Sequence, residues 1–252
     1  MPRLGSVNRS SHRLVLACAA ILLASYTAAV TPRSDHEIEV NVEQRLEGHP
    51  ELGSRSIRAS VDHGVATLEG RVRLLSEAWA AERVVADVRG LTGIENRLAV
   101  EETGRTNDEL RAALKRHFED RVELGGNIEI TVDAGHVVLA GTVKDARVRF
   151  TARDAAAETR GVLSVEDRIA TPATSDEDVL KAVKKLLGPG SLVGVRGAVR
   201  PTVKDGVVTL DGTVMILSSR TAAERVVFGI NGVKQVENHL AVVVKRPPGE
   251  WN

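Results

Sequence analysis

The nine residues Gly206-Val-Val-Thr-Leu-Asp-Gly-Thr-Val214 occur three times, with small changes, in this chain of 252 residues. The earlier copies are Gly64-Val-Ala-Thr-Leu-Glu-Gly-Arg-Val72 and Gly135-His-Val-Val-Leu-Ala-Gly-Thr-Val143. Their interior glycines, Gly70, Gly141 and Gly212, lie 71 residues apart. This fixed period indicates a tandem repeat of small domains.

A second signature keeps the same period. It reads Gly90-Leu-Thr-Gly-Ile-Glu-Asn-Arg-Leu98, Gly161-Val-Leu-Ser-Val-Glu-Asp-Arg-Ile169 and Gly232-Val-Lys-Gln-Val-Glu-Asn-His-Leu240. Because a copy of about 70 residues can enclose a small core of its own, we expect three domains, at 34–102, 106–171 and 175–244. Linkers of a few residues join them, and residues 245–252 are expected to form a disordered tail.

The first half of each repeat is predicted to be a helix followed by a β-hairpin. Ser34, Asn107 and Ser175 suit the N-cap of the helix, and acidic residues follow each of them. Apolar and polar residues then alternate along two strands. The first glycine of each nine-residue signature forms the turn between these strands, because glycine accepts the positive φ of a tight hairpin.

The second half of each repeat is predicted to be a helix and a last strand. The helix covers about residues 76–88, 146–159 and 218–230 and ends at the first glycine of the second signature, which suits a left-handed C-cap. Two helices on one face of a three-stranded sheet define an α+β fold of the order αββαβ. The interior glycine of the hairpin predicts that a helix backbone passes close over that strand, or that a bulge sits there.

Composition and charge exclude several classes of function. With 34 Lys and Arg against 34 Asp and Glu, the chain lacks the basic footprint of a nucleic-acid binder. Aromatic residues make up only 2%, so a pocket lined by rings is not expected. The single cysteine, Cys18, lies in the N-terminal apolar run, which leaves the repeats without a disulfide or a thiolate metal site.

Charge is distributed unevenly between the repeats. Residues 34–101 hold 8 basic and 13 acidic residues, residues 106–171 hold 10 and 12, and residues 175–244 hold 9 and 7. The net charges are therefore −5, −2 and +2. An anionic surface repels the first two repeats and attracts the third.

Residues 1–30 have the pattern of an export signal. Three arginines precede an apolar run over 14–23, and small residues then lead to Ala29, after which cleavage fits. The alternative is an uncleaved anchor, because residues 14–30 reach the lower edge of a membrane span. A lipoprotein at Cys18 is disfavoured, since a large residue stands where such motifs have a small one. In each case we expect the repeats in the periplasm or another extracytoplasmic space.

The two signatures resemble those of the BON domain family, named after bacterial OsmY and nodulation proteins. The likeness includes Ala223-Glu224 and its counterparts Ala81-Glu82 and Ala152-Arg153, and it covers nearly all of residues 34–244. It implies an αββαβ fold, export to the periplasm, and association with phospholipid membranes or envelope proteins, often in envelope or osmotic stress. It also implies a protein that is not an enzyme, because known relatives mostly are not.

Departures from the family pattern carry no sign of catalysis. Ser164 replaces a glycine of the second signature, and the glycine-rich segment 188–197 lacks the Gly-Lys-Ser/Thr ending of a phosphate loop, so a flexible loop is expected there. His63 and His136 lie in or beside hairpin turns of different domains, so no metal site is expected. The Gly-x-Ser-x-Gly motif of serine hydrolases does not occur in the sequence. The glutamate that recurs in the second signature, as Glu95, Glu166 and Glu237, is interpreted as capping a turn. We expect neither enzyme activity nor a cofactor.

Two aromatic residues are candidates for membrane contact. Trp79 and Phe150 occupy equivalent positions two residues before inward-facing alanines, about 200° away around the second helix. Beside Arg83 or Arg149, such rings suit a lipid headgroup layer. The alternative is that a slight rotation of the helix buries both rings.

Basic residues of the third repeat are the other candidates. Lys181, Lys184 and Lys185 form one face of its first helix, and together with Arg220 they suit a salt-sensitive attachment, each cation being worth about 1 kcal/mol near an anionic membrane. The leading hypothesis is a non-enzymatic exported envelope protein that binds anionic phospholipid and supports envelope integrity or the osmotic stress response. The alternatives are a multivalent protein-interaction scaffold or chaperone-like module, and a small-ion or ligand-binding module.

Export predicts a shortened native protein. If the apolar run is a signal peptide, the mature chain begins near Val30. The intact mass of protein purified from its producing cells tests this prediction. Retention of Met1 would favour the uncleaved anchor instead.

Overall fold

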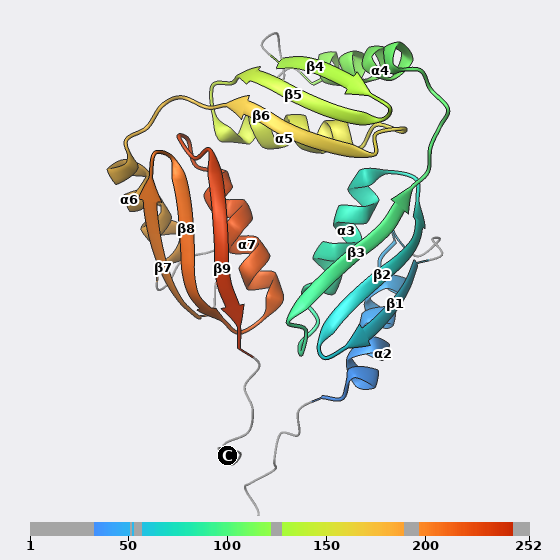
Figure 1. The fold of residues 1–252 in the computed structure, drawn as a ribbon, viewed down its shortest axis with the longest axis vertical. Coiled ribbons are helices and arrows are strands. Elements are labelled where there is room, and N and C mark those ends of the chain that lie inside the picture. The colour runs from blue at the N-terminus through green and yellow to red at the C-terminus, as the bar shows by residue number, and fades with distance from the viewer. Residues whose placement is uncertain (1–32, 51, 53–56, 122–127, 189–196, 244–252) are drawn as a thin grey trace, which may run out of the picture. The chain divides into compact units, whose positions relative to one another are not determined.

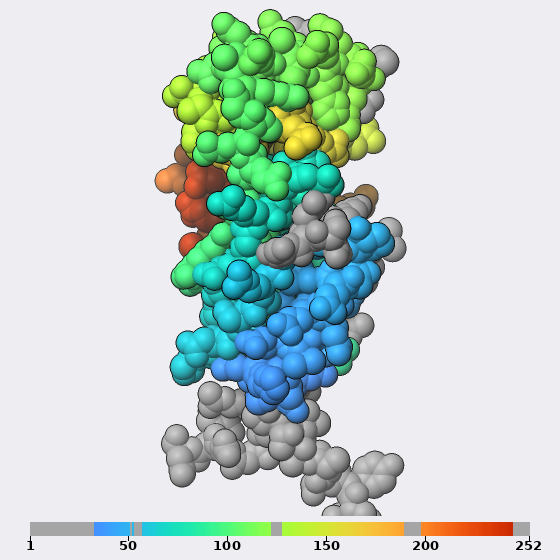
Figure 2. Space-filling model, turned by 90° about the vertical axis from the view of Figure 1, so that its right-hand side faces the viewer, coloured from blue at the N-terminus to red at the C-terminus, as the bar shows by residue number. Residues whose placement is uncertain are grey.

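The computed structural model describes residues 33–50, 52, 57–121, 128–188 and 197–243 (Figure 1). The described residues belong to one compact unit (Figure 2). The described residues form six helices and three three-stranded sheets, arranged as three repeated units. The predicted export segment, the tail and residues 189–196 of the glycine-rich segment lie outside the described residues.

Every repeat has the predicted order of elements, which confirms the α+β fold. Repeat 1 contains α2 (Asp35–Glu47), β1 (Ile57–Asp62), β2 (Val65–Val72), α3 (Leu75–Val85) and β3 (Gly93–Val100). Repeat 2 contains α4 (Asn107–Glu119), β4 (Ile128–Asp133), β5 (His136–Thr142), α5 (Ala146–Ala157) and β6 (Ser164–Ala170). Repeat 3 contains α6 (Asp176–Leu187), β7 (Gly197–Lys204), β8 (Val207–Val214), α7 (Leu217–Phe228) and β9 (Gln235–Val242).

The second strand of the hairpin is central in every sheet, in the orders β1-β2-β3, β4-β5-β6 and β7-β8-β9. It pairs antiparallel with the first strand and parallel with the last. Parallel neighbours need a long crossover, and the second helix provides it. Pro201 lies in β7, where a residue without an N–H is tolerated because β7 is an edge strand.

Both helices of a repeat pack into one core with the inward side chains of the central strand. In repeat 1, Val42 of α2, Leu68 of β2 and Val85 of α3 belong to one cluster and are fully buried. The corresponding residues are Leu114, Leu139 and Ala156 in repeat 2, and Val183, Leu210 and Val227 in repeat 3. Aliphatic side chains therefore make up nearly all of the three cores, as the low aromatic content predicts, and Phe118 is the one aromatic residue among the buried core residues that the structure describes.

Two of the three predicted N-caps are confirmed. Ser34 and Ser175 each accept a hydrogen bond from a backbone N–H three residues on. The prediction of Asn107 is wrong, because Thr106 is the cap and its hydroxyl accepts from the N–H of Glu109. In return, the N–H of Thr106 donates to the Glu109 carboxylate, which lowers the pKa of Glu109.

The residue after each cap fixes the hairpin turn of the same repeat. The Asp35 carboxylate accepts hydrogen bonds from the N–H groups of His63 and Gly64, at 2.8 and 3.0 Å. Asp176 holds the corresponding turn of repeat 3 at 2.7 and 2.9 Å. Asn107 accepts one such bond, at 2.9 Å, from the turn of repeat 2. This long-range bond occupies its side-chain oxygen and leaves the capping to its neighbour.

The second helices end earlier than predicted. α3 has its C-cap at Ala86, and a short turn closed by the bond from Val88 N–H to the Val85 carbonyl follows it. Gly90 does adopt a positive φ, of 106°, as do its two counterparts, but it lies beyond that turn and is not the C-cap. The C-cap prediction is wrong because it placed these glycines on the helix instead of in the loop before the last strand.

The interior glycines of the hairpins adopt φ values of +136°, +128° and +130°, a region essentially open only to glycine. At Gly212, an added Cβ would clash with the carbonyl oxygen of Ala198 on the adjacent strand β7. The pairing of β7 with β8 continues without a gap through Gly212. The prediction that a helix backbone passes close to this glycine, or that a bulge sits there, is therefore wrong at Gly212. The atom that leaves no room for a side chain is a backbone oxygen of the neighbouring strand.

Gly212→Ala is expected to lower the free energy of unfolding by about 3 kcal/mol or more, because alanine would be both strained and in contact with Ala198. Gly104→Ala is the control, since Gly104 also has a positive φ, +67°, but open space around it. Its cost is expected to be about 1 kcal/mol. Urea denaturation of the full chain measures both, and equal losses would show that the space beside Ala198 is not needed.

Candidate functional site

The three lysines predicted as a basic face are exposed on α6. Lys181, Lys184 and Lys185 lie on the side of the helix away from its buried residues, which are Val179, Val183 and Leu187. Within the described part of the chain, no ion pair or hydrogen bond engages any of the three ammonium groups. They form a cluster of accessible cations in the only net-basic repeat.

Arg220, the fourth predicted cation, lies on α7 and is half-buried. Its guanidinium donates to the backbone carbonyl of Asn238 at 3.4 Å. The structure therefore assigns Arg220 an intramolecular contact and places it on a different helix from the lysines.

Trp79 lies half-buried against the core of repeat 2. The guanidinium of Arg153, on α5, lies 4.5 Å from the centre of the Trp79 ring, within the range of a cation–π interaction. Trp79 therefore connects α3 with α5. Its role at a membrane stays a prediction, and in the structure the ring contacts protein.

Phe150 belongs to a second contact between helices, around a buried arginine. Its ring meets that of Phe228, on α7, edge to face, with the ring centres 5.8 Å apart. The Arg149 guanidinium lies 3.4 Å from the centre of the Phe228 ring. Arg149 is 3% exposed, and it donates to the Asp167 carboxylate at 2.8 Å and to the Val233 carbonyl at 2.9 Å. It thus joins repeat 2 to repeat 3.

The role of Arg149 was not predicted from the sequence, although one difference between the repeats indicates it. Asp167 stands where repeats 1 and 3 have Asn96 and Asn238. The amides of Asn96 and Asn238 each donate, at 3.0 Å, to a backbone carbonyl of the second helix. Asp167 occupies the same position in repeat 2, and an ionised carboxylate has no hydrogen to donate. A buried carboxylate needs a cation as its partner, and Arg149 is that cation.

Repeats 1 and 3 also meet through their second helices. Leu217, at the start of α7, is 4% exposed and belongs to the core cluster of repeat 1. The next residue, Ser218, donates its N–H to the Ala86 carbonyl at 3.0 Å. Each repeat therefore has side-chain or backbone contacts with both of the others.

The recurrent glutamates do not cap turns, so that interpretation is wrong. They lie inside the last strands and bind neighbouring side chains: Glu95 binds Arg97 at 2.6 Å, Glu166 binds Arg168 at 2.7 Å, and Glu237 accepts from Thr209 at 3.2 Å.

The predicted histidines also have local partners. His63 pairs with Asp62, which raises the pKa of His63 by hydrogen bonding and by charge, and His136 bonds Ser164 at 2.7 Å. Among the described residues, no cluster of three His, Cys, Asp or Glu is arranged to hold a metal. In that same part of the chain, no helix has the length and apolar content of a membrane span.

Comparison with known proteins identifies the family. The model of the BON domain matches residues 34–102, 106–173 and 175–244. The chain therefore belongs to the BON domain family, which confirms the resemblance carried by the two signatures.

Among curated proteins, Osmotically-inducible protein Y of Escherichia coli (strain K12) is 26% identical over an alignment of 148 residues that covers 54% of this chain and 72% of that protein. Two solved structures of CdsD, a structural protein of the type III secretion system of Chlamydia trachomatis, are similar at 17% and 15% identity. They cover 82% of this chain and 96% and 92% of their own, with TM-scores of 0.22 and 0.24. Likenesses this weak carry no structural or functional conclusion.

Arg149→Ala is expected to destabilise the chain by about 3–5 kcal/mol, because it leaves the Asp167 carboxylate buried without its cation. Arg168→Ala is the matched control, since the Arg168–Glu166 pair has a similar distance but is 63% and 56% exposed. Its loss is expected to be below about 1 kcal/mol. Chemical denaturation measures both variants, and a loss for Arg149→Ala no larger than the control's would contradict the buried-pair interpretation.

Proposed function

We propose that this chain is a non-enzymatic, exported envelope protein that attaches to anionic phospholipid membranes through repeat 3. The observation that carries the proposal is the cluster of three exposed lysines on α6, none of which has an ion pair or hydrogen bond with another described residue. Each cation near an anionic surface contributes about 1 kcal/mol, so that three on one helix face give a measurable, salt-dependent attraction. Membership of the BON domain family supports the proposal.

The other residues predicted to bind the membrane have contacts within the protein, which favours the lysines as the membrane-binding groups. Trp79 and Phe150 pack against other helices, and Arg220 bonds a backbone carbonyl. A membrane would have to compete with these contacts, whereas the ammonium groups on α6 are accessible. Attachment of this kind is electrostatic and peripheral, without insertion of rings into the lipid layer.

The similarity to a protein named for osmotic induction supports a role in the osmotic stress response. A change in ionic strength acts directly on a peripheral electrostatic contact, because added salt shortens the range over which charges attract. Binding through the lysines would therefore respond to the ionic conditions around the envelope.

The combined substitution Lys181→Glu, Lys184→Glu and Lys185→Glu is expected to abolish sedimentation with vesicles that contain phosphatidylglycerol. It turns attraction into repulsion at a surface whose field extends over a Debye length of about 8 Å at physiological salt. Variants are made in the full chain and purified from exporting cells. Vesicles of phosphatidylcholine alone should bind neither the wild type nor the variant.

The control reverses three exposed cations of the other repeats, Arg71→Glu, Lys115→Glu and Lys144→Glu, and so changes the total charge equally. It should bind vesicles nearly as well as the wild type does. If the α6 variant sediments like the wild type, the basic-face mechanism is wrong, and contact with an envelope protein becomes the better hypothesis.

A further inference from the structure

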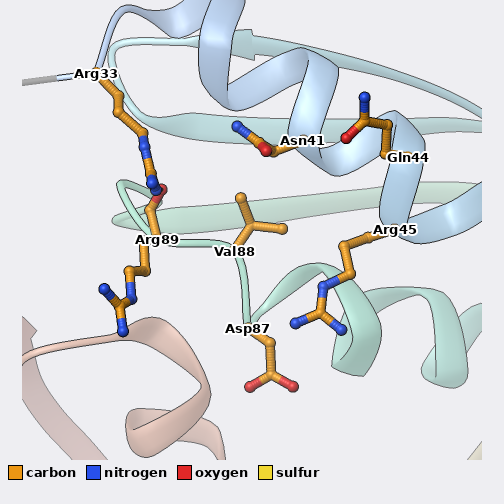
Figure 3. A pocket seen from close by; sticks show the side chains of 7 residues that line it. All are labelled: Arg33, Asn41, Gln44, Arg45, Asp87, Val88 and Arg89. Atoms are coloured by element: carbon orange, nitrogen blue, oxygen red, sulfur yellow. The ribbon is translucent and has the colours of Figure 1, made fainter.

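A pocket of about 320 Å³ lies in repeat 1, between α2 and the loop that follows α3 (Figure 3). It is lined by Arg33, Asn41, Gln44, Arg45, Asp87, Val88 and Arg89. The side chains of Arg33 and Arg45 lie on opposite sides of Val88, which is 5% exposed and forms an apolar floor (Figure 3). Arg89 follows Val88 on the side of Arg33 (Figure 3).

The charge of this pocket is opposite to that of its repeat. Three arginines and one carboxylate, that of Asp87, line it, although repeat 1 carries a net charge of −5. In the described part of the chain, the guanidinium groups of Arg45 and Arg89 have no hydrogen bond or ion pair. Arg33 uses one N–H, which donates to the Arg89 carbonyl at 3.3 Å. The remaining N–H donors of Arg33, Arg45 and Arg89 are exposed, and the Arg89 side chain extends away from Val88 (Figure 3).

Part of this arrangement serves the fold. Arg105 donates to the Arg160 carbonyl at 2.9 Å in repeat 2, which is the same contact that Arg33 makes. A cation such as Arg45, in the last turn of α2, also offsets the negative end of the helix dipole. Neither the bond to the carbonyl nor the effect on the helix dipole uses the guanidinium of Arg89. Neither explains why Arg45 and Asp87, which line the same pocket, form no ion pair with each other.

The guanidinium of Arg45, which has no hydrogen bond or ion pair within the described residues, has no counterpart in the other two repeats. The equivalent residue in repeat 2 is His117, which is bound to the Thr159 hydroxyl at 3.1 Å. In repeat 3 the position is occupied by Leu186, which has no charge. The three repeats share the fold around this position, so this exposed cation beside the loop after the second helix is found in the pocket of repeat 1 alone among the described residues.

We propose that this pocket binds a phosphate group, either free, on a small soluble molecule, or on a lipid headgroup. The planar guanidinium group presents paired N–H donors that match two oxygens of a phosphate. Gln44 adds a neutral donor at the rim, and the apolar floor at Val88 suits a short carbon substituent. The volume is at the lower end for ligand pockets, which fits a phosphate with a small group attached. The site does not involve the lysines of α6.

Chemical-shift titration of the full chain with inorganic phosphate and with glycerol 3-phosphate tests this proposal. We expect the amide signals of Val88 and Arg89 to shift with saturation. Arg45→Gln combined with Arg89→Gln should weaken the affinity about tenfold or more. Asp87→Asn should strengthen it, because the substitution removes a carboxylate that repels phosphate.

Arg58→Gln combined with Arg71→Gln is the matched control, since both are exposed arginines of repeat 1 outside the pocket. This control should bind phosphate like the wild type. The absence of saturable shifts, or shifts that persist unchanged in the Arg45 and Arg89 variant, would overturn the proposal.

Short-chain phosphatidylglycerol separates the two sources of the phosphate. Stronger binding than that of glycerol 3-phosphate, lost in the Arg45 and Arg89 variant, would assign the pocket to a lipid headgroup. Equal or weaker binding would assign it to a soluble phosphate. The α6 lysine variant should keep its affinity for phosphate, so that failure of the membrane proposal and failure of this one are seen separately.

Discussion

Hydrogen bonds at the hairpin turn hold three distant segments of each repeat together. The turn donates its N–H groups to the first residue of the first helix and accepts, at Gly64, Gly135 and Gly206, a bond of 2.8–2.9 Å from the loop before the last strand. A Cβ at Gly135 would lie 3.0 Å from the Gly161 carbonyl, so turn and loop approach too closely for a side chain. This constraint couples the two signatures and keeps them in one register.

Much of this fold is predictable from the sequence because it rests on local patterns. Alternation along the strands and the apolar period of the helices follow from which face is buried, and three copies of each pattern remove ambiguity. The predictions that were wrong depend on individual contacts between residues that are distant in the sequence. Thr106 caps α4 because Asn107 is engaged by a turn 27 residues away, and Gly212 is required by a carbonyl of the adjacent strand. Neither neighbour is visible in a local pattern.

The candidate site also contains residues whose environment was predictable from the sequence and residues whose environment was not. The lysines of α6 were predictable, because a charged helix face opposite an apolar one is exposed whatever surrounds the domain. Trp79 and Phe150 were not, since their partners Arg153 and Phe228 come from other repeats, and reading each repeat by itself leaves such rings at the surface. The pocket beside Arg45 escaped notice because its residues come from three short stretches without any common motif.

The contacts of the buried arginine make the order of the three repeats matter. Arg149 takes its carboxylate from its own repeat but its ring and carbonyl, at Phe228 and Val233, from the repeat that follows. Newly duplicated copies are identical and can stand in any order. The order of the copies matters once one of them carries such a cation, because another neighbour would not supply the ring of Phe228 and the carbonyl of Val233, although the ion pair with Asp167 would remain.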